Sequence, residues 1–115
     1  YQSTIALPPA YGDPAIRPAN LTDIRIEKEG DRKYLVWSAP EHRHGEHETD
    51  PVRFVVYEFY SGEKQDIEDP QAIVALTPYR KMLIDPDAQG VTYAVTALDR
   101  MNRESEPIFL YNQDN

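Results

Sequence analysis

The sequence predicts an all-β domain, a seven-stranded antiparallel β-sandwich, and three observations lead to that fold class. First, apolar Val91, Tyr93, Val95 and Ala97 alternate with other residues, which is the period of a strand with one buried face. Second, seven short apolar segments follow one another between turns that contain Gly, Pro and Asp. Third, no stretch has the spacing of an amphipathic helix. Strands of this number and spacing are typical of antiparallel sandwiches.

The chain begins with a proline-rich segment that has no regular period. Pro8, Pro9 and Pro14 disfavour both a helix and a central strand, so we expect an extended linker here. The apolar periodicity starts only afterwards. The expected organisation is a linker over residues 1–17, a sandwich over residues 18–111 and a short tail over residues 112–115.

Seven strands are expected within the sandwich. The first includes Leu21, Ile24 and Ile26 and ends at a turn over residues 29–31. The others are expected at residues 34–37, 52–60, 73–76, 81–84, 91–99 and 108–110.

Three of these expected strands have a predicted place in a sheet. Residues 52–60 have apolar side chains on both faces, which favours a central strand. Residues 91–99 and 108–110 are joined by a polar turn, and Pro107 at the start of the last strand has no N–H to donate. These two segments are therefore expected to form a hairpin at a sheet edge.

Composition excludes several classes of function. The 115 residues include 20 Asp and Glu but only 12 Lys and Arg, a formal net charge of −8. An acidic surface repels phosphate backbones and anionic lipid, so nucleic acid is not an expected partner. No apolar run is long enough for membrane insertion. The absence of cysteine excludes disulfides, thiolate metal sites and cysteine nucleophiles. Because the chain begins at Tyr1, we expect a fragment or a processed product.

Five segments carry a resemblance to a known family. They are Pro18-Ala19-Asn20-Leu21, Leu35-Val36-Trp37-Ser38-Ala39-Pro40, Phe54-Val55-Val56-Tyr57, residues 91–99 and Glu104-Ser105-Glu106-Pro107. In this order and spacing they resemble a fibronectin type III domain over residues 18–111. The resemblance implies an immunoglobulin-like β-sandwich that supports or binds rather than catalyses.

A closer resemblance narrows the expected context. Residues 54–63, 66–70, 73–77 and 91–107 are similar to the C-terminal module of bacterial glycosyl-hydrolase-like ten proteins. The resemblance implies that a barrel catalytic domain precedes the module in the same parent chain. It also implies export of the whole protein to the periplasm, the cell surface or the medium. The segment Ile5-Ala6-Leu7-Pro8-Pro9 looks like the tether that leaves such a barrel.

One residue departs from the pattern of these relatives. They carry a tyrosine where this chain has Val91, and that tyrosine hydroxyl bonds back to the backbone before the strand. We expect this corner to be missing here or to be satisfied by another group. Losing one such hydrogen bond costs about 1 kcal/mol, which a sandwich of this size tolerates.

A histidine-rich segment is the strongest candidate for metal binding. His42 and His44 share one face of an extended chain, so they can converge on one ion, with His47 or Glu46 completing the set. The simpler interpretation is a solvated loop, because a short loop seldom holds ligands in tetrahedral geometry. We therefore expect no metal and no cofactor.

Aromatic residues are the candidates for ligand binding. Trp37 and Tyr93 are expected in the core, because the sandwich pattern places both between the sheets. The candidates for exposed platforms that stack on a polysaccharide are Phe59, Tyr60, Tyr79 and Tyr111.

The sequence therefore predicts a non-catalytic module. It has no Gly-rich phosphate loop and no nucleophile elbow, and its carboxylate pairs lie in expected turns. We expect an accessory or spacer module that packs on, or positions, the catalytic domain of the same parent chain. The alternative is a carbohydrate-binding module that uses exposed aromatic residues. A third interpretation is a protein-interaction domain that uses an edge strand or the loop over residues 41–51.

Overall fold

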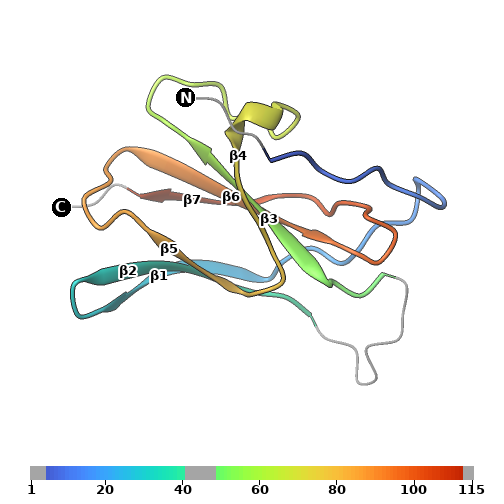
Figure 1. Cartoon of the computed structure of the whole chain (residues 1–115), viewed down its shortest axis with the longest axis horizontal. Helices are drawn as coiled ribbons and strands as arrows, with labels where there is room; N and C mark the ends of the chain where they lie inside the picture. The colour runs from blue at the N-terminus through green and yellow to red at the C-terminus, as the bar shows by residue number, and fades with distance from the viewer. Residues whose placement is uncertain (1–4, 41–48, 113–115) are drawn as a thin grey trace.

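The computed structural model describes residues 5–40 and 49–112, which form two antiparallel sheets (Figure 1). The three-stranded sheet has the order β1-β2-β5, and the four-stranded sheet has the order β4-β3-β6-β7. The strands are β1 (Asp23–Glu29), β2 (Arg32–Ser38), β3 (Arg53–Phe59), β4 (Ile73–Thr77), β5 (Lys81–Ile84), β6 (Val91–Leu98) and β7 (Ile108–Asn112). One short 3-10 turn, η1 (Pro70–Ala72), precedes β4. The predicted all-β sandwich is confirmed, and each of these strands overlaps an expected one.

The main core lies between the two sheets. β2 contributes Leu35 and Trp37, and β6 contributes Val91, Tyr93, Val95 and Ala97 on one face. Trp37 contacts Phe54 of β3 edge to face, with 5.8 Å between the ring centroids. Trp37 and Tyr93 are both 1% exposed, so the prediction that they belong to the core is confirmed.

A second core covers the outer face of the four-stranded sheet. Alternate residues of β3 and β6 point to this side, and they are Val55, Tyr57, Phe59, Ala94 and Leu98. Ile5, Leu7, Ile67 and Ala72 pack over them. All eight residues of β6 are therefore buried, and the predicted central position of β3 is confirmed.

This second core corrects one expectation. Phe59 is only 3% exposed, so it is not an exposed platform. Its ring stacks on that of Tyr57, with 6.4 Å between the centroids. The alternation of β3 places Phe59 on the outer face, but residues from the N-terminal segment and from the connection before β4 cover that face.

The β6–β7 hairpin lies at the edge of its sheet, as predicted, with Val95 paired to Ile108 and Val91 paired to Asn112. Val91 is buried in the core. The Asn112 side-chain amide donates to the Ala88 carbonyl at 3.2 Å. A side chain of β7 thus bonds to the backbone just before β6.

Candidate functional site

The first feature that bears on function is the path of residues 5–17, called the entry segment below. It has no helix or strand, in keeping with its prolines. Figure 1 shows it in blue, passing along the molecule and turning back toward β1. The Tyr11 amide donates to the Met101 carbonyl at 2.8 Å, which ties the entry segment to the turn after β6. Ile5 and Leu7 pack on the second core, so the segment is held against the sandwich.

A buried ion pair organises the turn that holds the entry segment. Arg103 Nε lies 2.9 Å from Asp99 Oδ2, and the two side chains are 4% and 0% exposed. The other carboxylate oxygen, Asp99 Oδ1, accepts from the Met101 amide at 2.9 Å and from the Arg103 amide at 3.0 Å. Both oxygens of the buried carboxylate are thus hydrogen-bonded, which buried charges require.

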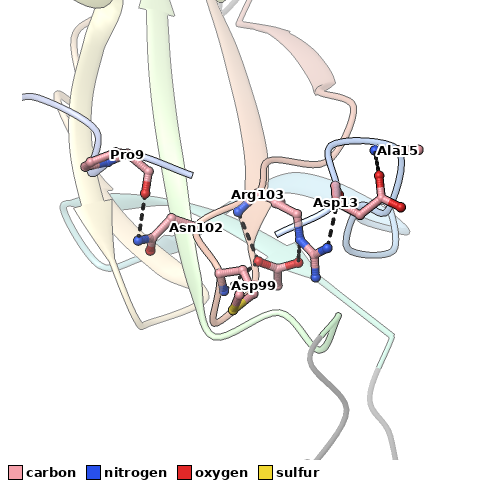
Figure 2. Close-up of polar contacts among 7 residues, drawn as sticks. Pro9, Asp13, Ala15, Asp99, Asn102 and Arg103 are labelled. Carbon is pink, nitrogen blue, oxygen red and sulfur yellow. Dashed lines mark hydrogen bonds and ion pairs between the residues drawn. The ribbon is translucent and has the colours of Figure 1, made fainter. Parts of the chain in front are cut away.

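Two side chains reach from this turn to the entry segment (Figure 2). Arg103 Nη1 donates to the Asp13 carbonyl at 3.2 Å. The Asn102 amide donates to the Pro9 carbonyl at 3.2 Å. We call these two contacts and the Tyr11–Met101 hydrogen bond the clasp; it joins Met101, Asn102 and Arg103 to the entry segment, and Asp99 supports it by pairing with Arg103.

The backbone conformation of the entry segment suits the clasp. Gly12 has a φ of +78°, a region that favours glycine. A Cβ at this position would lie 3.3 Å from Met101 Cε and 3.4 Å from Arg103 Nη1. Glycine therefore permits both the turn and the close approach to Arg103.

The second feature is a hollow lined by aromatic rings, which we call the aromatic groove. It has a volume of about 350 Å³, and Tyr60, Phe109 and Tyr111 form part of its wall. The register explains this grouping, because Thr92 of β6 pairs with Phe59 on one side and with Tyr111 on the other. The structure thus brings together two of the four predicted aromatic residues, Tyr60 and Tyr111.

Tyr79 does not join this group. It lies in the turn after β4, whose last residue, Thr77, pairs with Phe54 near the start of β3. Tyr60 directly follows the other end of β3. Because the pairing is antiparallel, Tyr79 and Tyr60 lie at opposite ends of the sheet.

Phe109 was missed by the sequence reasoning, although it is 44% exposed. The signal was the alternation of β7, in which Ile108 and Leu110 pack on the main core. Their neighbours Phe109 and Tyr111 must then share the opposite face.

A second, adjoining hollow of about 760 Å³ shares Gln65 and Phe109 with the aromatic groove. Glu104 lies in its wall and accepts hydrogen bonds from the hydroxyls of Tyr57 and Thr96, the latter at 2.6 Å. Burial, followed by the neighbouring Glu104 carboxylate, raises the pKa of Tyr57 well above its usual range. The phenol therefore stays neutral and fixes the orientation of the Glu104 carboxylate.

The expected histidine site cannot be placed. His42, His44 and His47 lie outside the described residues. Within residues 5–40 and 49–112, no three side chains of His, Asp or Glu are gathered as a metal site would require. The same part of the chain contains no helix that is long and apolar enough to cross a membrane.

Comparison with known proteins adds no assignment. No family model matches the chain, and no curated protein matches it. The clasp and the aromatic groove are therefore the basis for any functional assignment.

Proposed function

We propose that the chain is a non-catalytic accessory module of fibronectin type III type, carried by a larger exported bacterial protein. Its task is to hold a preceding catalytic domain of the same parent chain in a fixed orientation. The strand order β1-β2-β5 facing β4-β3-β6-β7, with buried Trp37 between the sheets, supports the fibronectin-like assignment. The resemblance to modules of glycosyl-hydrolase-like ten proteins, which covers residues 54–63, 66–70, 73–77 and 91–107, supports the exported context.

The single observation that carries the positioning role is the clasp. An entry segment that only links two domains needs no contact with the sandwich, and it would then act as a loose spacer. Here three hydrogen bonds join it to the turn after β6, and the buried pair of Asp99 and Arg103 supports that turn. A domain attached ahead of residue 5 is therefore expected to leave the sandwich in one direction.

The experiment compares the full parent protein with two variants by small-angle X-ray scattering. Asn102→Gly removes the side-chain amide that donates to Pro9, together with the Oδ1 that accepts from Arg53, and it keeps the left-handed backbone, because residue 102 has a φ of 62°. Leu83→Ala alters an exposed residue of the other sheet and is the matched control.

We expect the wild type and Leu83→Ala to fit one arrangement of domains. We expect Asn102→Gly to need an ensemble of arrangements, with a larger radius of gyration. A parent chain without a domain ahead of this one would contradict the proposal. So would scattering of Asn102→Gly that matches the wild type.

A further inference from the structure

The two outer faces of the sandwich differ in chemistry. On the three-stranded sheet, Lys81 pairs with Glu29 at 2.9 Å and lies over the ring of Tyr34, and Arg25 pairs with Glu27 at 2.8 Å. These exposed charged groups have partners within the sheet, which is typical of a solvated face. On the four-stranded sheet, the part that the entry segment leaves open carries exposed aromatic rings instead.

Three rings gather on this open part. Tyr60, Phe109 and Tyr111 are 52%, 44% and 57% exposed, and all three line the aromatic groove. Phe109 and Tyr111 stand next to the smaller Ala94 and Thr92 of β6, with which they pair. Large side chains beside small ones leave a hollow with an aromatic side wall.

Hydrogen-bonding groups lie around the same rings. Gln65 lines both hollows, and its amide nitrogen donates to Thr92 Oγ1 at 3.3 Å. Glu63 lines the aromatic groove, and its Oε1 accepts from the Tyr60 amide at 2.6 Å. In the adjoining hollow, Glu104 is half-buried and is oriented by two hydroxyls. The acceptors are thus preorganised along an aromatic wall.

We propose that the two hollows together form a binding site for a neutral oligosaccharide. The apolar C–H face of a pyranose ring stacks on Phe109 and Tyr111, whose flat faces are rigid and carry partial negative charge. Sugar hydroxyls donate to the acceptors Glu63, Gln65 and Glu104. Hollows of about 350 and 760 Å³ are in the size range of small-molecule sites.

Charge decides between the possible occupants. Glu63 and Glu104, in a protein with a net charge of −8, repel uronates and sulfated sugars. Arg17 also lines the larger hollow, but it is paired with Glu106 at 2.8 Å. A protein partner would have to bury the same carboxylates at the centre of its interface, where such residues are depleted. A neutral sugar supplies hydroxyl donors and no charge, so it fits both the rings and the carboxylates.

The test measures binding of the purified chain to soluble neutral glycans by isothermal titration calorimetry. The probes are β-glucan, xylan and mannan oligosaccharides, with alginate and heparin oligosaccharides as anionic probes. The variants are Phe109→Ala and Tyr111→Ala. Tyr79→Ala is the matched control, because Tyr79 is an aromatic residue, 71% exposed, at the opposite end of the sheet.

We expect saturable binding to at least one neutral probe, weakened about tenfold or more in Phe109→Ala and Tyr111→Ala and unchanged in Tyr79→Ala. Native fluorescence from buried Trp37 verifies that each variant is folded. The proposal is overturned if no neutral probe binds, if the anionic probes bind more tightly, or if Tyr79→Ala weakens binding equally. These binding outcomes do not involve the clasp. A failure to bind glycans is therefore distinct from a failure of the scattering test of the positioning role.

Discussion

Replacing Arg103 with methionine is the sharpest perturbation of the clasp. The substitution keeps an unbranched side chain but removes the guanidinium that lies 2.9 Å from Asp99 Oδ2 and 3.2 Å from the Asp13 carbonyl. It leaves the Asp99 carboxylate, 0% exposed, without its countercharge. Removing one partner of a buried ion pair typically costs about 3 to 5 kcal/mol.

The structure favours the lower part of that range for Arg103→Met. Asp99 Oδ1 keeps its two backbone donors, the amides of residues 101 and 103, so the carboxylate retains part of its stabilisation. We therefore expect the free energy of unfolding to fall by about 3 kcal/mol. That is a large part of the roughly 5 to 15 kcal/mol that stabilises a typical domain.

Urea unfolding, followed by the fluorescence of the single Trp37, measures this loss. Arg17→Met is the matched control, because Arg17 pairs with Glu106 at 2.8 Å but both side chains are more than half exposed. Such a surface pair contributes about 1 kcal/mol or less. Hydrogen exchange of the Tyr11 amide reports the clasp itself, since that amide bonds to the Met101 carbonyl.

Substitutions at Asp99 and Arg103 should be non-additive in their effect on the free energy of unfolding. Adding Asp99→Asn to Arg103→Met removes the uncompensated charge, so the double variant should recover part of the stability that Arg103→Met loses. The reasoning is refuted if Arg103→Met loses no more stability than Arg17→Met while the Tyr11 amide keeps its protection.

Three further predictions concern the sandwich. Burial, followed by the nearby Glu58 carboxylate, raises the pKa of Tyr93 from 10.0 to about 12. The neutral phenol therefore stabilises the fold fully below about pH 10, and this contribution is lost as the pH rises toward 12. The loss of stability between pH 10 and pH 12 should be smaller in Tyr93→Phe than in the wild type, and an equal loss would show that Tyr93 titrates normally. Asn112→Ala removes the bond to the Ala88 carbonyl and should lower the free energy of unfolding by about 1 kcal/mol in urea, whereas no change would mean that water replaces the amide. Trp37→Phe should lower the free energy of unfolding by about 1 to 3 kcal/mol through the space it leaves. A neutral effect would indicate that this loss is offset by removal of the indole N–H, which has no hydrogen-bond partner among the described residues.

Much of the fold could be predicted from the sequence, because its signals are local. The alternation in residues 91–98 marks one face of β6, and the apolar run over residues 52–60 marks β3 as a central strand. Turn residues then separate the strands. The order of the strands within each sheet and the burial of the outer face of the four-stranded sheet depend on contacts between distant segments. The local signals do not encode these contacts.

The candidate site was harder to predict for the same reason. Proline density in residues 1–17 indicates an extended chain but not where that chain lies, so the contacts of Arg103 with Asp13 could not be foreseen. The covering of Phe59 by the entry segment and by residues near η1 was equally hidden. Phe109 was missed, but the alternation of β7 could have indicated it, because its neighbours on either side are core residues.

Backbone ¹⁵N relaxation over residues 5–17 is the most direct test of the claim that the entry segment is part of the sandwich. Residues 5–13 include those that pack on the second core and those held by the clasp. For these residues we predict order parameters close to those of the strands, about 0.85. Values below about 0.6 across residues 10–13 would show a freely moving tether and would contradict the positioning role.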